Sequence, residues 1–307
     1  MLDCVATLIA GPSGEGITEA AVDAAALALE ALGAEGVLSD WLAPGAACDL
    51  FFAGLFPDQA DAALRLLLAK QFPDAPLDLV VQPAEGRRKR LAVADMEATI
   101  IENEMLIELA EFIGAGASVA EITRRAMNGE IDFVEALKAR TALFEGLPAS
   151  VLDEAQSRIK PMPGAAVFVA TMRAHGAFVA LVTGGFGVFA RHVGDMLGFD
   201  AVVCNELVIE GGRLTGELAL PILDRDGKLA AAKRLAAERG VSLGATLAVG
   251  DGANDLPMIE AAGLGVAFRA KPAVAARARL RIDHADLTAL LYAQGYRVEE
   301  FVTASGA

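Results

Sequence analysis

Residues 246–255, TLAVGDGAND, decide the fold. Their first part, Thr246–Val249, is an apolar run with the length of a buried strand, and a glycine-rich turn follows it. Asp251, Asn254 and Asp255 therefore stand directly after the predicted strand. In open sheets of parallel strands, ligands bind at the carboxyl ends of the strands. These three side chains are therefore candidates for a binding site.

The same pattern occurs at two other apolar runs. The run LAVA is followed at once by Asp95 and Glu97, and the run Phe178–Thr183 ends in Thr-Gly-Gly, with Gly184 next in the chain. Carboxylates at the ends of neighbouring strands can bind a hard cation, and hydroxyl and backbone N–H groups can bind phosphate oxygens. Lys228, on a predicted helix, adds a positive charge. The sequence thus predicts a cation and phosphate site.

Residues 86–302 have the strand and helix order of an α/β protein. Two more apolar runs, Ala201–Cys204 and Leu264–Phe268, complete the series, and helical stretches of ten or more residues separate most of the runs. This alternation predicts a doubly wound parallel sheet with helices on both faces. Residues 102–164 have helical periodicity and no strand signal. We expect them to form a helical insertion between the first and second strands of the sheet.

Residues 1–84 predict a smaller unit in the order strand, helix, strand, strand, helix, strand, which is that of a ferredoxin-like α+β fold. The predicted strands and helices are Cys4–Ala10, Thr18–Leu32, Gly36–Leu42, Cys48–Leu55, Asp58–Lys70 and Leu77–Gln82. This order resembles the small amino-acid-binding regulatory (ACT) domains, which implies an amino-acid ligand. A module without a ligand that serves solubility or joins a homodimer is the alternative.

Composition limits the partners and the compartment. A formal net charge of −15 repels nucleic acid. The sequence contains no run of about 18 apolar residues free of charges, which is the length that a membrane-spanning helix needs. The first residues lack the basic segment of a secretory leader. Cys4, Cys48 and Cys204 suit buried thiols better than disulfides. We expect a cytoplasmic protein, in which the basic run 87–90 is a solvated linker.

The motifs together resemble one superfamily. DMEAT at 95–99, LVTGGF at 181–186 and VGDGAND at 249–255, with EITRRAMNGEIDF at 121–133 in the insertion, are similar to those of the haloacid dehalogenase superfamily and, within it, the phosphoserine phosphatases. The resemblance extends over about residues 88–295. It implies a haloacid dehalogenase-like fold with a helical cap, and hydrolysis of O-phosphoserine, a small phosphomonoester, through a phosphorylated aspartate with Mg²⁺.

The resemblance also implies a role for each matched residue. Asp95 would be the nucleophile and Glu97 the general acid and base. Mg²⁺ would be bound by Asp95, the backbone carbonyl of Glu97 and Asp251, with Asp255 nearby. The residues that would hold the phosphate are Thr183, Gly184, Lys228 and Asn254. The residues that would bind the rest of phosphoserine are Glu104 at its amino group, Arg140 at its carboxylate, and Met127 and Phe133 as an apolar wall.

Two positions depart from the family pattern. The family has Asp and Ser where this chain has Glu97 and Ala98. Glu has a similar intrinsic pKa, but its extra methylene moves the carboxyl group. A phosphoserine:homoserine phosphotransferase also carries Asp-x-Glu, so transfer to an alcohol, or action on another small phosphomonoester, stays open. A catalytically weakened regulatory protein is the third reading.

Overall fold

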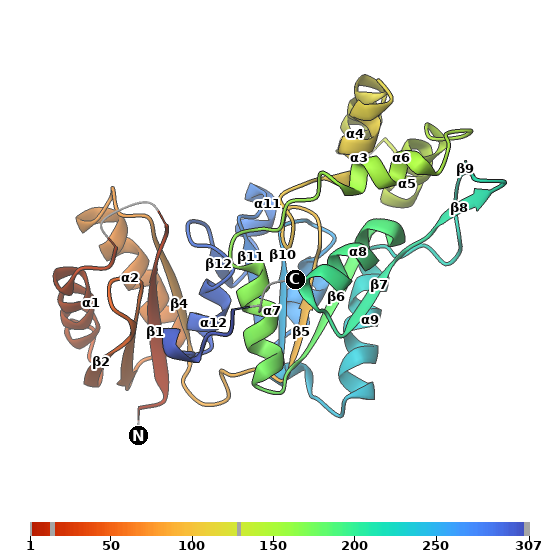
Figure 1. The fold of residues 1–307 in the computed structure, drawn as a ribbon. Coiled ribbons are helices and arrows are strands. Elements are labelled where there is room, and N and C mark those ends of the chain that lie inside the picture. The colour runs from red at the N-terminus through yellow and green to blue at the C-terminus, as the bar shows by residue number, and fades with distance from the viewer. Residues whose placement is uncertain (1, 13–15, 128–129, 304–307) are drawn as a thin grey trace.

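The computed structural model describes residues 2–12, 16–127 and 130–303, and the side chain of Met127 lies outside this description. The described residues form a four-stranded sheet, a six-stranded sheet and a two-stranded hairpin. Figure 1 shows the four-stranded sheet beside the larger sheet, with a group of helices beyond one end of the larger sheet's strands. The predicted fold class, a parallel α/β sheet with a helical cap and a small α+β unit, is confirmed.

The smaller sheet has the predicted element order. Its elements are β1 (Cys4–Ala10), α1 (Glu19–Ala31), β2 (Glu35–Ala43), β3 (Ala47–Ala53), α2 (Pro57–Gln71) and β4 (Leu77–Pro83). The strands lie in the order β2-β3-β1-β4 and each pair is antiparallel. Thr18 caps α1 by accepting a hydrogen bond from the backbone N–H of Ala21.

The two faces of the smaller sheet pack against different partners. Successive strand residues point to opposite faces, so Ala6 and Leu8 pack with the apolar side chains of α1 and α2, while Ile9 joins the core of the larger part. Asp78 on β4 accepts hydrogen bonds from the backbone N–H groups of residues 283–285 at 2.7 to 3.3 Å. The apolar core therefore continues across the boundary predicted near residue 85.

The larger sheet is parallel throughout. Its strands are β5 (Leu91–Ala94), β6 (Phe178–Phe186), β7 (Ala201–Asn205), β10 (Thr246–Gly250), β11 (Leu264–Phe268) and β12 (Leu280–Ile282). They lie in the order β12-β11-β10-β5-β6-β7. The sequence analysis found every strand except β12, because that strand is short and has Arg281 at its centre.

Helices cover both faces of this sheet, as predicted. They are α7 (Ala165–Ala174), α8 (Gly187–Leu197), α9 (Arg225–Glu238), α10 (Leu256–Ala261), α11 (Pro272–Ala275) and α12 (Ala289–Ala293). On β5, Leu91 and Val93 pack with α9 and α10, and Ala92 and Ala94 pack on the other face with α7, α8 and α12. Both faces of each central strand are buried, which explains why the runs are continuously apolar.

Four short helices form the insertion, which lies beyond the carboxyl ends of β5 and β6 (Figure 1). They are α3 (Met105–Phe112), α4 (Gly116–Met127), α5 (Phe133–Ala142) and α6 (Ser150–Gln156). The chain enters and leaves this cap side by side, with an antiparallel bridge between Ile101 and Pro161. The limits 102–164 remain a prediction.

A hairpin that the sequence did not reveal reaches the cap. β8 (Leu207–Glu210) and β9 (Arg213–Leu218) pair as an antiparallel ribbon. The N–H of Gly146 donates to the carbonyl of Leu214 at 2.8 Å, and the N–H of Leu214 donates to Leu147 at 2.9 Å. The loop between α5 and α6 of the cap is therefore hydrogen-bonded to the β8–β9 hairpin, which follows β7 in the chain.

The interpretation of residues 87–90 as a solvated linker is wrong for Arg87 and Lys89, while Arg88 and Arg90 are exposed. Arg87 pairs with the buried carboxylate of Asp49 at 2.6 Å. Lys89 is buried and donates to the carbonyls of Gly86 and Gly244. Arg87 and Lys89 thus contact an acid of β3 and carbonyl groups of residues 86 and 244, and the local sequence of the run does not show these contacts.

Within the described residues no helix is both long and apolar enough to cross a membrane. Cys4, Cys48 and Cys204 are free thiols, as expected.

Candidate active site

The order of the central strands brings the predicted site residues to one edge. β5 lies between β10 and β6, and the N–H of Asp95 donates to the carbonyl of Val249 at 3.0 Å. Asp95 follows β5, Asp251 follows β10, and Thr183 lies where β6 leaves regular pairing with β7. Segments separated by more than 60 residues therefore converge at the carboxyl ends of the strands, as the sequence analysis expected.

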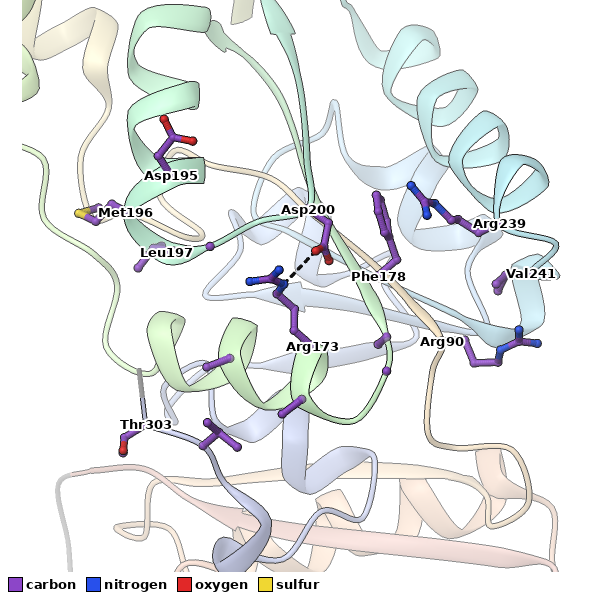
Figure 2. Close-up of a pocket in the computed structure, with 16 residues that line it drawn as sticks. Arg90, Arg173, Phe178, Asp195, Met196, Leu197, Asp200, Arg239, Val241 and Thr303 are labelled. Atoms are coloured by element: carbon purple, nitrogen blue, oxygen red, sulfur yellow. Dashed lines mark hydrogen bonds and ion pairs between the residues drawn. The ribbon is translucent and has the colours of Figure 1, made fainter. Parts of the chain in front are cut away.

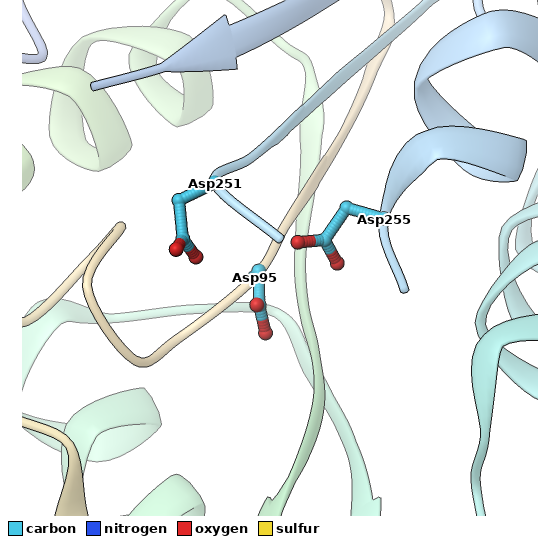
Figure 3. Close-up of side chains that lie close together, drawn as sticks. All are labelled: Asp95, Asp251 and Asp255. Carbon is cyan, nitrogen blue, oxygen red and sulfur yellow. The ribbon is translucent and has the colours of Figure 1, made fainter. Parts of the chain in front are cut away.

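Three buried carboxylates gather there. Asp95, Asp251 and Asp255 each offer an oxygen within 4.8 Å of the others. Figure 3 shows Asp251 and Asp255 extending from the loop after β10 toward Asp95. Like charges at this spacing repel strongly when water is excluded. Because all the donors are carboxylate oxygens, the cluster fits a hard divalent cation, which would offset that repulsion.

Lys228 supplies one internal cation. Its Nζ lies 2.7 Å from Oδ1 of Asp95 and 2.7 Å from Oδ1 of Asp255. Burial alone would lower the pKa of Lys228, but Asp255 and Asp95 more than offset this and raise it above its ordinary value. The lysine is therefore charged and pairs with two of the three acids.

The two oxygens of Asp95 differ in their surroundings. Oδ1 receives the Lys228 ammonium and, at 2.8 Å, the N–H of Met96. Oδ2 has no hydrogen-bond partner in the part of the chain that the structure describes. One oxygen is thus fixed and the other is open for reaction or for a ligand.

Glu97 lies beside the same cluster. Burial, followed by the charges of Glu104 and Asp95, raises the pKa of Glu97 to about 8. Its Oε1 accepts a hydrogen bond of 3.0 Å from the N–H of Met105, the first residue of α3. A side chain with this pKa holds its proton at neutral pH and can donate it.

Thr183, one of the predicted phosphate-binding residues, lies close to Glu97. A Cβ placed on Gly185 would lie 3.2 Å from Oγ1 of Thr183 and 3.3 Å from Cδ of Glu97, so both side chains lie against this glycine. The Thr183 hydroxyl oxygen accepts the N–H of Gly185 at 3.0 Å. Gly184 is next in the chain and faces the cap.

Asn254 is half-buried, with its side-chain oxygen over Gly252. Within the described residues its side chain makes no hydrogen bond, so its predicted role in binding phosphate stays a prediction.

The cap brings two predicted substrate-binding residues together. Glu104 is the residue before α3, and Arg140 lies on α5. Burial lowers the pKa of Arg140, while Glu97 and Glu104 act in the opposite direction. Burial also raises the pKa of Glu104, and Lys271 opposes this change most strongly. Glu104 and Arg140 thus lie close enough to Glu97 for the three charges to act on one another.

Phe133 reaches the phosphate-binding segment. A Cβ on Gly184 would lie 3.5 Å from Cζ of the Phe133 ring. Met127 is the last residue of α4, and the position of its side chain lies outside the described residues. The structure therefore brings Phe133 to the site and does not test Met127.

The sequence analysis missed two features of the site. Nζ of Lys271 lies 3.4 Å from Asp251 and 3.9 Å from Glu104, so this lysine spans the acid cluster and the cap. Its signal was its position just past the carboxyl end of β11. A Cβ on Gly250 would lie 2.5 Å from the Asp255 carboxyl carbon, so only glycine leaves room for that acid.

A further cavity lies away from these residues. About 810 Å³ in volume, it is lined by the amino-terminal end of β6, by α7 and by the end of α8, as Figure 2 shows. Arg173 forms an ion pair with Asp200 across it at 2.9 Å, and Arg239 lies over the Phe178 ring. None of the predicted site residues lines it.

Comparison with known proteins defines the family. Residues 92–260 match the family model of haloacid dehalogenase-like hydrolases, and the chain belongs to this family. It is 41% identical over 239 residues to a phosphoserine phosphatase of Streptomyces coelicolor, an alignment that covers 77% of this chain and 58% of that protein. It is 42% identical over 203 residues to a phosphoserine phosphatase of Lactococcus lactis, with 66% of this chain and 94% of that protein covered.

The whole chain also has a structural counterpart. A haloacid dehalogenase family hydrolase of Salmonella enterica serovar Typhi superposes with a TM-score of 0.82 at 27% identity, over 95% of this chain and 98% of that one. The chain spans 57 to 63% of the length of three of its longer curated relatives.

Proposed function

We propose that this chain hydrolyses O-phosphoserine to serine and phosphate with Mg²⁺, through a phosphorylated Asp95. One observation carries the proposal. Glu97, two residues after Asp95 of the acid cluster, lies close enough to a carboxylate, Glu104, and a guanidinium, Arg140, for their charges to act on one another. An ammonium and a carboxylate on one small molecule would satisfy both, since each would gain a charge-assisted hydrogen bond.

The relatives support the same substrate. The Streptomyces and Lactococcus proteins are named phosphoserine phosphatases, and the second matches over nearly its whole length. Residues 92–260, which match the family model, contain the acid cluster and the cap.

In the first step we propose that Oδ2 of Asp95 attacks phosphorus. The bond between phosphorus and the seryl oxygen breaks, and protonated Glu97 gives its proton to that oxygen. Lys228 fixes the attacking carboxylate through its other oxygen, at 2.7 Å. Magnesium, when bound by Asp95, Asp251 and the Glu97 carbonyl, with Asp255 nearby, would neutralise charge on the transferring group.

In the second step the Glu97 carboxylate takes a proton from water, whose oxygen attacks the phosphorus of the aspartyl phosphate. The bond between phosphorus and Asp95 breaks and phosphate leaves. Thr183, the Gly184 amide, Lys228 and Asn254 would bind the phosphate oxygens during both steps. These contributions are positioning and electrostatic, which is how proteins catalyse most phosphoryl transfers.

The Glu at position 97 keeps transfer to an alcohol as the competing activity. The carboxyl group receives the N–H of Met105, so the cap helix α3 determines where the longer side chain ends. An acceptor alcohol that took the place of water would give a phosphoester in place of free phosphate.

One assay separates these activities. The chain is incubated with O-phosphoserine and MgCl₂, with and without homoserine, and phosphate and phosphohomoserine are measured together. We expect phosphate release that homoserine does not divert, and release that chelation of the metal abolishes. Phosphohomoserine as the main product would replace the proposal by transfer. No product from phosphoserine, with turnover of another small phosphate ester, would contradict the substrate.

For the smaller sheet we propose a regulatory role with an amino acid as ligand, or assembly of a homodimer. The βαββαβ order supports this proposal. Free thiols fit a reducing compartment, and we propose that the chain acts in the cytoplasm. Binding of serine followed by calorimetry, and the mass of the chain in solution by light scattering, test the two roles.

A further inference from the structure

We propose that Asn205 is a positioning residue of the active site, which holds the phosphate-binding end of β6 in register with the helix that carries Lys228. This inference rests on the proposed function. Asn205 is the last residue of β7, and 1% of its surface is exposed. Asn205 itself does not contact the reacting groups. Its side chain joins two segments that carry residues of the proposed site.

The first segment is the end of β6. Regular pairing between β6 and β7 is interrupted between Val182 and Phe186, and Phe186 pairs again with Asn205. The interruption contains Thr183 and Gly184. The side-chain amide of Asn205 donates to the carbonyl of Gly184 at 2.8 Å, in the place where the ladder is broken. Its hydrogen bond thus fixes a peptide that strand pairing leaves free.

The second segment leads into α9. The same amide group donates to the carbonyl of Leu223 at 3.2 Å, and the side-chain oxygen of Asn205 accepts the N–H of Leu223 at 2.6 Å. Leu223 precedes Asp224, the residue that caps α9. Lys228 lies one turn further along, with its ammonium 2.7 Å from Asp95.

Three hydrogen bonds therefore determine how far Gly184 lies from the start of α9. A buried amide with both N–H bonds and its oxygen engaged has one orientation, so the two segments move together. If Thr183 and Gly184 hold the phosphate from one side and Lys228 from another, their separation determines whether both reach it. Small displacements of such groups reduce the rate strongly.

The test is Asn205→Ala, measured beside Gln294→Ala. Gln294 is an equally buried side-chain amide far from the site. It accepts the N–H of Lys89 at 2.9 Å and donates to the carbonyl of Leu290 at 2.8 Å. Both variants lose a buried amide that holds backbone groups, and only Asn205 holds groups of the site. For each variant kcat, KM and the melting temperature are measured, together with the rise in melting temperature caused by inorganic phosphate with MgCl₂.

We expect Asn205→Ala to lower kcat by about 10- to 100-fold and to reduce the phosphate-induced rise. Gln294→Ala should lower the melting temperature similarly and leave kcat and the phosphate-induced rise unchanged. Asn205→Asp is the second variant. It keeps the shape and the acceptor for Leu223, loses the donor to Gly184, and should behave as Asn205→Ala does.

The inference is overturned if either Asn205 variant has the kcat and the phosphate-induced rise of Gln294→Ala. Failure of the proposed function would give a different result, in which the unchanged chain does not hydrolyse phosphoserine. In that case the variants can still be compared by the rise in melting temperature that inorganic phosphate with MgCl₂ causes.

Discussion

Buried aspartates occur in both sheets of this protein, and they are arranged in opposite ways. In the smaller sheet, Asp49 accepts the Thr7 hydroxyl at 2.7 Å and pairs with Arg87. Asp78, in the same sheet, receives three backbone N–H groups. In the larger sheet, the buried acids after β5 and β10 lie within 4.8 Å of one another, and two of them, Asp95 and Asp255, share Lys228.

The difference separates acids that hold the structure together from the acids that we propose take part in catalysis. Burial raises the pKa of Asp49, Asp78, Asp251 and Asp255 alike, so the direction of the shift does not distinguish the two groups. What distinguishes them is the partners. Each structural acid has its own donors, whereas the three acids of the site lie within 4.8 Å of one another and outnumber the two lysines, Lys228 and Lys271, that pair with them.

Asp95→Asn should have the largest effect on activity, and it should separate activity from stability most clearly. Hydrolysis of phosphoserine should fall by about 10⁴-fold or more, because the attacking oxygen is lost. The free energy of unfolding should change by no more than about 1 kcal/mol, since Asp255 still pairs with Lys228 and repulsion is reduced. Steady-state kinetics and urea denaturation measure the two. Surviving turnover would mean that Asp95 is not the nucleophile.

Arg87→Met should have the opposite result, a loss of stability without a loss of activity. It leaves the Asp49 carboxylate buried without its cation, which costs about 3–5 kcal/mol of folding free energy. Urea denaturation measures this loss, and kcat at 25 °C should be unchanged in the folded protein. The double variant Arg87→Met, Asp49→Leu should recover stability. A loss of activity in folded Arg87→Met would show that the pair also acts on the site.

Arg140→Ala tests the substrate-binding side of the cap. The value of kcat/KM for phosphoserine should fall by about 10- to 100-fold, because a charge-assisted hydrogen bond to the substrate carboxylate is lost. O-phosphoethanolamine has the ammonium and lacks the carboxylate, so its KM, or its inhibition constant, should not change. Equal losses for both compounds would indicate a structural role for Arg140 in the cap.

Lys271→Met should show the smallest effect. The ammonium lies 3.4 Å from Asp251, and its side chain is 63% exposed. Removing it takes a competing cation from the acid cluster, so the MgCl₂ concentration for half-maximal activity should fall by about two- to fivefold. Lys271→Arg keeps the charge and should leave this concentration unchanged. A higher concentration in Lys271→Met would show that the lysine supports metal binding.

Local sequence was sufficient to predict most of the strands and helices and the acids at the ends of the strands. Each apolar run with an acidic or glycine-rich end carries its own signal, and parallel strands place such ends at one edge. Local sequence was not sufficient for β12, which has three residues, nor for the hairpin β8–β9. The basic run 87–90 was misinterpreted because its partners come from elsewhere in the chain.

The sequence by itself determined the α/β class, the smaller βαββαβ unit and the candidates Asp95, Thr183 and Asp251, because periodicity and glycine turns act over a few residues. Only the tertiary structure decided that Arg87 neutralises Asp49 and that Asn205 joins Gly184 to Leu223. The physical reason is that a buried polar group takes its partner from whichever segment the strand order places beside it, and that order is a property of the whole chain.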